Sequence, residues 1–291
     1  MTDMIEINLP LLREHALPRA DDATDKDSRG RVFMIAGSEL SPGAALLSGT
    51  SALRGGAGKV VVATIAPAAI TLGLLAPEFG IVSLASSHGE PTVSDEVLDY
   101  HLDKCDAVLL GPGMSEPKNA LGVALRLLQK CRNPVVLDAA AISALAEHFD
   151  AVKESRAHCI LTPHAGEMAA LTGKSKEAVE ADPVQVASDT ARALGCTIIL
   201  KGATTYVVTR DGHCWKHVGG VRGLATAGSG DTLAGLLVGL LARGADEVSA
   251  CCWSVAVHAK AGSMLTDRLG EVGLLARELP TLFPQIMRNW A

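Results

Sequence analysis

The chain has 291 residues, of which 48% are hydrophobic and 3% aromatic, and its formal net charge is −6. It contains no Lys- or Arg-rich run and no stretch of roughly 18 apolar residues, which argues against nucleic-acid partners, anionic membranes and transmembrane helices. The N-terminus has no apolar signal-peptide centre, so the sequence predicts a cytoplasmic protein with a core of Ala, Val, Leu and Ile.

A helical piece and a polar loop at 21–30 open the chain, and the first strand is expected to begin at Arg31. Short apolar runs then alternate with helical patterns. The predicted strands are 31–37, 59–64, 107–113, 133–139, 158–164 and 196–202. The predicted helices are 43–58, 121–131, 141–149 and 183–195, and the last has Asp182 as its cap.

The last third of the chain changes character. Residues 204–218 contain Arg210-Asp211-Gly212, which is typical of a hairpin turn, and the chain after Gly230 is almost wholly helical. Continuous Val/Ile/Leu strands that alternate with helices imply right-handed βαβ crossovers. The sequence therefore predicts an α/β fold, with a mostly parallel central sheet, helices on both faces and a small antiparallel edge hairpin, as a single domain over residues 1–291.

The seven cysteines show no metal-site or redox spacing. None of them forms a C-x-x-C pair, and Cys251 and Cys252 are adjacent in an Ala-rich segment. We expect reduced, mostly buried thiols that behave as small apolar residues.

The most specific motif is Gly-Ser-Gly-Asp at 228–231, directly before a helical run. Two glycines remove side-chain bulk there, so backbone N–H groups at the positive end of a helix can face a transferring phosphoryl group. Asp231 would lie beside that anion and could take a proton from an attacking hydroxyl. The alternative is that Asp231 only stabilises the helix dipole.

Other strand ends carry weaker signals. Gly113 lets a ligand approach the backbone, or is only part of a turn; His164 can bind a polar ligand, or is an exposed loop residue. Lys201, with the glycine and hydroxyls that follow it, could hold a phosphate or form a polar corner, whereas Glu167 compensates the dipole of the next helix. Ligands gather at the carboxyl ends of parallel strands, so together these residues predict a site.

Taken together, the segments resemble the ribokinase-like superfamily and, within it, the ADP-dependent NAD(P)H-hydrate dehydratases. The resemblance rests on "TPHAGEM" at 162–168, on "KGATTYVV" at 201–208 and, most specifically, on "ATAGSGDTLAGLLVGLLARG" at 225–244. One departure concerns Ala140, because the family often has a second Asp there, two residues after Asp138.

The resemblance implies a site for the hydrated nicotinamide nucleotide and a site for ADP. Asp231 and Gly228 are its implied catalytic residues. The implied residues for hydrated NADH or NADPH are Ala44, Gly113, His164 and Asp231. The implied residues for ADP are Lys201, Gly202, Ala203, Thr204, Thr205 and Gly230. ADP is the implied co-substrate and Mg²⁺ the implied cofactor, with no protein ligand assigned to the metal.

The expected reaction transfers a phosphoryl group to the C6 hydroxyl of the S epimer and then eliminates phosphate, which regenerates NADH or NADPH with AMP and phosphate. Two alternatives stay open: a ribokinase-like kinase for a hydroxymethylpyrimidine or thiazole alcohol, and an inactive nucleotide-binding paralogue. The family also implies a homotetramer, with the helix around Cys251 as a candidate surface. An epimerase for the other stereoisomer is expected to be a separate protein.

Overall fold

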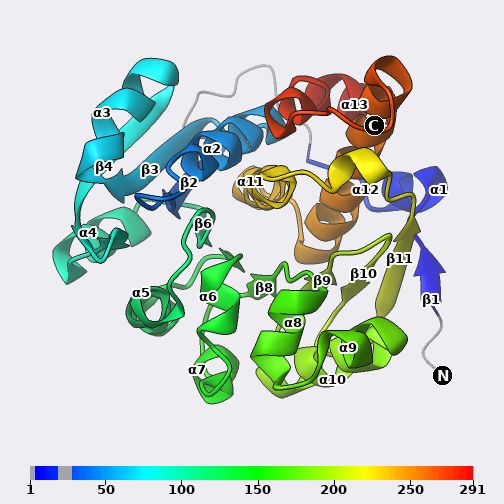
Figure 1. Ribbon diagram of the computed structural model, residues 1–291, viewed down its shortest axis with the longest axis horizontal. Helices are drawn as coiled ribbons and strands as arrows, with labels where there is room; N and C mark the ends of the chain where they lie inside the picture. Colours follow the sequence, from blue (N-terminus) through cyan, green and yellow to red (C-terminus); the bar gives the residue numbers. More distant parts are fainter. Residues whose placement is uncertain (1–3, 19–27, 291) are drawn as a thin grey trace.

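The computed structural model describes residues 4–18 and 28–290, and its strands form one eleven-stranded sheet (Figure 1). The order of the strands across the sheet is β1-β11-β10-β9-β8-β7-β6-β2-β3-β4-β5. Most of the loop predicted at 21–30 lies outside the described residues. The prediction that the first strand begins at Arg31 is wrong, because β1 (Met4–Glu6) precedes it and pairs with the strand at 214–218.

The central strands are parallel, as predicted. They are β2 (Arg31–Ile35), β3 (Lys59–Ile65), β6 (Ala107–Leu110), β7 (Val135–Leu137), β8 (Cys159–Leu161) and β9 (Thr197–Leu200). β4 (Phe79–Ser87) and β5 (Glu90–Thr92) extend the sheet beyond β3, and no strand was predicted there.

The predicted hairpin forms antiparallel strands β10 (Thr204–Val208) and β11 (Cys214–Val218). β10 also pairs antiparallel with β9, so β11 runs in the same direction as the central strands. The parallel strand β1 lies outside the hairpin and forms the edge of the sheet. The carboxyl end of β11 therefore lies at the same edge of the sheet as the carboxyl ends of β7, β8 and β9.

Helices cover both faces. Alternate residues of each central strand belong to different cores: Val32 and Met34 to one, Phe33 and Ile35 to the other. The helices of the first face are α1 (Leu9–Glu14), α2 (Gly43–Gly55), α3 (Ala66–Leu75), α11 (Ser229–Ala242), α12 (Glu247–Leu269) and α13 (Phe283–Trp290). Those of the second are α4 (Asp95–Leu102), α5 (Pro117–Lys130), α6 (Ala140–Ser143), α7 (Phe149–Lys153), α8 (Ala165–Thr172), α9 (Lys176–Ala181) and α10 (Pro183–Leu194).

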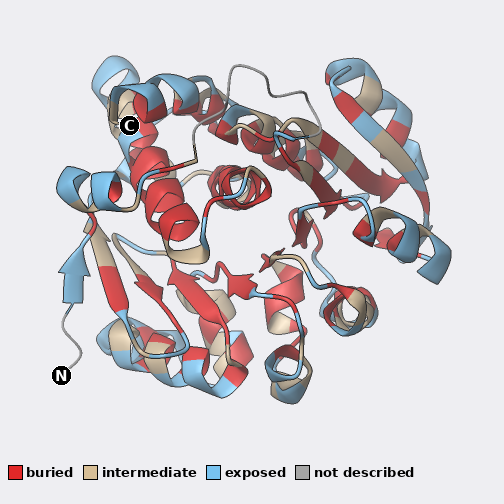
Figure 2. Cartoon of the chain, turned by 180° about the vertical axis from the view of Figure 1, so that it is seen from behind, coloured by how far each residue is buried: buried red, intermediate tan, exposed pale blue. Residues whose placement is uncertain are grey.

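The helix α11 is buried along almost its whole length, and Figure 2 shows its turns coloured as buried. Its glycines let it lie directly against α2. A Cβ atom at Gly235 would come within 2.2 Å of the Ser48 carbonyl oxygen, and one at Gly239 within 2.4 Å of the Ala52 carbonyl oxygen. Backbone cannot yield to such overlaps, so these two glycines fix the position of α11 and of its N-terminus.

All seven cysteines are free and buried, as predicted. Cys251 and Cys252 are wholly buried in α12, so the proposal that this segment forms a subunit surface is wrong. Small residues suit a helix interior as well as an interface, and here they pack in the core. Within the described parts of the chain, no helix is long and apolar enough to cross a membrane.

Candidate active site

The carboxyl ends of β7, β8 and β9 and the N-terminus of α11 meet at one place in the molecule. Asp138 follows β7, the segment containing Thr162 and His164 follows β8, and Lys201 follows β9. Neighbouring parallel strands bring these residues together although long stretches of sequence separate them.

The first turn of α11 is an anion cradle, by which we mean residues 228–230. Gly228 has a φ of 85°, which favours glycine, and it begins the helix without any side-chain cap. The first N–H groups of a helix have no partner within it. The Ser229 amide donates to the Thr226 carbonyl at 3.2 Å, which leaves the amides of Gly228 and Gly230 to face an anion. A Cβ atom at Gly230 would lie 3.2 Å from the Lys201 ammonium nitrogen, which places that charge beside the cradle.

Four charged residues form what we call the buried charge cluster next to the cradle: Asp138, which is buried, and Glu167, Lys201 and Asp231, which are half-buried. The Lys201 Nζ lies 3.0 Å from Asp138 Oδ1 and 3.7 Å from Glu167 Oε2. Asp138 is almost completely buried and also accepts a hydrogen bond of 2.7 Å from the Thr162 hydroxyl. The cluster therefore holds one ammonium group against several carboxylates.

The proton affinity of Asp231 is strongly altered. Burial, reinforced by the negative charges of Asp138 and Glu167, raises its pKa to about 7, although Lys201 opposes the shift. The Asp231 carboxylate has no hydrogen bond or ion pair to another described residue. A free carboxylate with this pKa can take a proton near neutral pH, which is what a general base requires.

Lys201 stays charged in this setting. Burial opposes its charge, but Asp138, Glu167 and Asp231 outweigh that effect and raise the pKa of Lys201 above its ordinary value. The ammonium group is thus a permanent positive charge beside the cradle, suited to the phosphate oxygens of a nucleotide.

Asp138 and Glu167 are not among the residues predicted for the site. Asp138 is held by an unusual backbone: Ala139 has a φ of 51°, and a Cβ atom at Gly111 would lie 1.9 Å from the Asp138 carbonyl oxygen. Strain of this kind costs on the order of 1–3 kcal/mol and persists only where the surroundings enforce it. The useful signal in the sequence was its position directly after a buried strand, since no local motif marks it.

Position 140, where the family often has a second Asp, is the first residue of α6 and not its cap. The contacts of Asp138 with Thr162 and Lys201 do not involve Ala140. The buried charge cluster is therefore complete without a carboxylate at that position.

His164 lies beside Lys201 in the backbone, through an isolated parallel bridge. Its Nδ1 accepts hydrogen bonds from the amides of Gly166 and Glu167, so the ring caps α8. Glu167 completes a capping box by accepting from the His164 amide, which is more than the dipole compensation predicted for it. Its Nε2 lies 3.7 Å from Glu167 Oε1, and the ring is exposed, so a ligand can still reach its outer edge.

Gly113 and Ala44 are in direct contact. With a φ of 74°, Gly113 packs so closely that a Cβ atom would lie 2.7 Å from the Ala44 Cβ and 2.5 Å from the Ser41 carbonyl oxygen. The Ser38 hydroxyl donates a hydrogen bond of 2.6 Å to the Gly113 carbonyl. The missing side chain of Gly113 thus makes room for the loop before α2. This close packing brings Gly113 and Ala44, the two residues predicted to bind the substrate, into contact.

The loop before α2 also lines a polar cavity of about 310 Å³. Its lining includes Ser38, Glu39, His88 and Glu90. Glu90 is buried and accepts from the amide and hydroxyl of Ser115, so it holds the loop after β6 in position.

The segment at 201–205 joins β9 to β10. Gly202 and Ala203 are exposed, and Thr204 and Thr205 are half-buried at the start of β10. The amide of Gly220 donates to the Ala203 carbonyl at 3.2 Å, which holds the loop after β11 against this segment.

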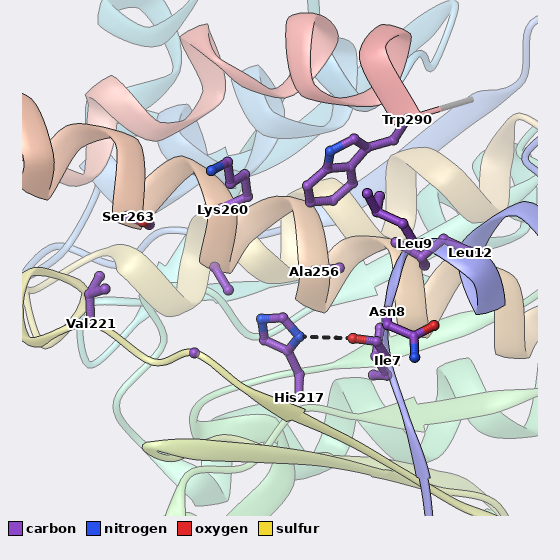
Figure 3. A pocket seen from close by; sticks show the side chains of 12 residues that line it. Ile7, Asn8, Leu9, Leu12, His217, Val221, Ala256, Lys260, Ser263 and Trp290 are labelled. Atoms are coloured by element: carbon purple, nitrogen blue, oxygen red, sulfur yellow. Dashed lines mark hydrogen bonds between the residues drawn. The ribbon is translucent and has the colours of Figure 1, made fainter.

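The loop after β11 borders a mostly apolar cavity of about 390 Å³ (Figure 3). Figure 3 shows His217 and Val221 on one side, Ala256, Lys260 and Ser263 of α12 on another, and Trp290 across the opening. A cavity with apolar walls and a few polar groups is typical of a site for a flat, partly polar ring. Gly220, whose amide donates to the Ala203 carbonyl, stands between the lining residues Gly219 and Val221, and this contact connects the cavity to the predicted nucleotide residues.

A resident metal ion has no ready set of ligands here. No three His, Cys, Asp or Glu side chains within residues 4–18 and 28–290 are arranged to hold one. The carboxylates of Asp138 and Glu167 face Lys201. This donor set fits Mg²⁺ that arrives with phosphates and keeps most of its waters.

Comparison with known proteins gives a consistent result. The sequence profile of a family described as NAD(P)H-hydrate dehydratase matches residues 32–285. The chain is 43% identical over 282 residues to the ADP-dependent (S)-NAD(P)H-hydrate dehydratase of Xanthomonas campestris, covering 95% of this chain and 93% of that protein. It is 31% identical to the enzyme of the same name from Bacillus subtilis, over 98% of this chain and 100% of that protein.

Solved structures and longer relatives add to this. The structure of the ADP/ATP-dependent NAD(P)H-hydrate dehydratase of Bacillus subtilis, co-crystallised with ATP and Mg²⁺, aligns over 100% of both chains with a TM-score of 0.86 and 27% identity. A hydroxyethylthiazole kinase from Pyrococcus horikoshii, at 18% identity and a TM-score of 0.60, shares the fold. The chain spans about half the length of relatives named bifunctional NAD(P)H-hydrate repair enzymes, such as that of Escherichia coli.

Proposed function

The chain belongs to the NAD(P)H-hydrate dehydratase family, and from this premise we propose that it uses ADP to dehydrate the S epimer of hydrated NADH and NADPH. The products are NADH or NADPH, AMP and phosphate, so the enzyme is a lyase that repairs damaged nicotinamide nucleotides. The observation that carries this proposal is Asp231, a half-buried carboxylate with a pKa of about 7 beside an anion cradle and a charged lysine.

In the proposed mechanism, Asp231 takes the proton of the C6 hydroxyl while that oxygen attacks the β-phosphoryl group of ADP. The P–O bond to AMP breaks, and the N–H groups of the cradle with Lys201 stabilise the negative charge in transit. The ring-nitrogen lone pair then expels phosphate from C6, and loss of a proton from C5 restores the dihydronicotinamide ring.

We assign the predicted residues to two halves of the site. Ala44, Gly113 and His164 bind the hydrated nucleotide next to Asp231, on the side of the loop before α2. Lys201, Gly202, Ala203, Thr204, Thr205 and Gly230 contact ADP, with Gly228 shaping the cradle. The apolar cavity beyond Ala203 receives the adenine base, which its position next to this segment supports.

Mg²⁺ would neutralise charge on the phosphates; phosphate oxygens and waters would hold it, and Asp138 and Glu167 would be available to bind those waters. We further propose that residues 1–291 form one domain in a cytoplasmic homotetramer, which the single sheet through the described residues supports for the domain. A separate epimerase for the other stereoisomer stays a prediction.

The test of this function is direct. Incubation with hydrated NADH, ADP and Mg²⁺ is expected to restore the absorbance of the dihydronicotinamide ring and to release AMP and phosphate in equal amounts. A kinase for a hydroxymethylpyrimidine or thiazole alcohol would instead leave a stable phosphoester and no renewed absorbance. ADP binding without any product would favour an inactive nucleotide-binding protein.

Filling the apolar cavity is expected to weaken nucleotide binding selectively. An Ala259→Phe substitution puts a ring into the space assigned to adenine, and we expect the Kd for ADP to rise roughly tenfold or more, equivalent to about 1.4 kcal/mol. Turnover at saturating ADP should stay close to that of the wild type. Isothermal titration calorimetry measures the Kd for ADP, and the absorbance assay measures turnover at saturating ADP. Ser263→Ala, which removes an atom from the same wall, serves as the control, and an unchanged Kd in Ala259→Phe would place adenine elsewhere.

A further inference from the structure

A histidine of α12 lies directly behind the anion cradle. His258 is buried, and its Nε2 lies 3.0 Å from the carbonyl oxygen of Ser229, the first residue of α11. The same nitrogen is 3.3 Å from the Ser229 hydroxyl and 3.2 Å from the Thr232 hydroxyl. The carbonyl oxygen is the nearest of the three atoms and only accepts hydrogen bonds, so we assign the ring proton to Nε2, which donates it to the carbonyl.

The first turn of α11 needs such support. It begins with Gly228-Ser229-Gly230 and has no side-chain cap, although such a cap usually stabilises a helix. Two glycines in a turn also leave the backbone unusually free. A bulky capping side chain on the open side would occupy the place where the phosphoryl group must lie, so the turn can be secured only from the rear.

Two side chains hold the first turn of α11 through the Ser229 carbonyl. It accepts the His258 N–H and also the Thr232 hydroxyl, at 2.7 Å. Burial lowers the pKa of His258 to about 4, against the hydrogen bond to Ser229, so the ring is neutral at working pH. A neutral donor holds the turn without adding a second cation that would compete with Lys201 for the carboxylates of the buried charge cluster.

We propose that His258 is a positioning residue for phosphoryl transfer: through the Ser229 carbonyl it keeps the first turn of α11, and with it Asp231, aligned with Lys201. This proposal rests on the proposed function for its kinetic consequence, but not for its structural one. Misplacement of a reacting group by about 1 Å can cost on the order of 100-fold in rate, so the effect should appear mainly in kcat.

Three variants test the proposal. His258→Leu removes the donor, and we expect kcat to fall by roughly 30- to 100-fold while KM for ADP changes by less than about threefold. His258→Gln, which retains an N–H of similar reach, should recover most of the lost kcat. Trp253→Phe is the matched control, because Trp253 lies on α12 like His258 but away from the cradle. Its indole N–H donates to the His15 carbonyl at 2.8 Å. It should lower Tm and leave kcat unchanged.

A second readout does not depend on activity. The amide of Thr232 donates to the Gly228 carbonyl at 3.1 Å, and its hydrogen exchange reports opening of the first turn. In His258→Leu, the Thr232 amide should exchange at least about tenfold faster than in the wild type. In His258→Gln and Trp253→Phe, its exchange rate should stay close to that of the wild type. If His258→Leu does not fold, His258→Asn, whose shorter amide falls short of the carbonyl, takes its place.

The two proposals fail in different ways. A wild-type chain with no dehydratase activity would overturn the proposed function and leave the exchange result to decide the role of His258. Unchanged exchange at Thr232 would overturn that role, and so would a kcat loss that His258→Gln does not restore.

Discussion

An Asp231→Asn variant is expected to lose at least roughly 10³-fold in turnover and yet to unfold at a higher temperature than the wild type at pH 8. The loss follows from the general base, whose removal typically costs 10²- to 10⁴-fold. ADP binding should change little, because Asn keeps the size of the side chain and removes only a negative charge near the phosphates.

The gain in stability follows from the sign of the pKa shift. Asp231 has a pKa of 3.8 in an unfolded chain and about 7 in the folded one, so the folded state holds the proton more tightly. Its contribution to stability is therefore fully present below pH 4 and is lost as the pH rises through about 7. At pH 8 the ionised carboxylate lowers the free energy of unfolding, by up to about 4 kcal/mol for a shift of this size.

Thermal unfolding of both proteins from pH 4 to 8, together with the absorbance assay, measures this. The excess Tm of Asp231→Asn should be largest at pH 8 and vanish towards pH 4. Asp182→Asn is the control, because Asp182 caps α10 through the Gln185 amide and Asn caps a helix equally well. An Asp231→Asn variant that is no more stable at pH 8 than at pH 4, relative to the wild type, would show that Asp231 is not held at a raised pKa.

The parts of the fold that the sequence predicts well have a local cause. Runs such as residues 32–35 and 60–63 are continuously apolar because both faces of a parallel strand are buried. β4 and β5 have no such run, since most of β4 is exposed or half-buried near the edge of the sheet. β1 is three exposed residues, and only its pairing with β11 makes it a strand.

Some residues of the candidate site also have a local cause in the sequence, and others do not. Asp231 and the cradle could be predicted because a glycine-rich helix start has a recognisable spacing. Asp138 could not, because its meaning comes from Lys201, which is 63 residues away in the chain and 3.0 Å away in space. His258 lies 29 residues from Ser229 inside a run of buried small residues. Residues whose role is to orient others carry no pattern of their own.

Removing the one ammonium group of the buried charge cluster is expected to damage both activity and stability. In Lys201→Met, the carboxylates of Asp138, Glu167 and Asp231 lose their common counter-charge. Breaking a buried pair in this way costs about 3–5 kcal/mol at pH 8. The deficit should be smaller at pH 5, where Asp231 is protonated in the folded state.

The pH profile gives the sharper measurement. In the wild type, kcat/KM should rise with pH through about 7 as Asp231 loses its proton. Lys201 lowers the pKa of Asp231, so Lys201→Met should move this inflection to higher pH, in addition to weakening ADP binding. The double variant Lys201→Met/Asp138→Asn should recover part of the stability, because the uncompensated charge is removed, but none of the activity.

Lys130→Met provides the matched control for a lysine–aspartate pair. Lys130 lies 2.8 Å from Asp99 at the surface, where such pairs contribute about 0–1 kcal/mol. An equal loss of stability in Lys130→Met and Lys201→Met, or an unshifted inflection in the latter, would mean that Lys201 does not control the cluster. The opposite result would show that one half-buried lysine, Lys201, both neutralises the site and sets the pH at which Asp231 becomes a base.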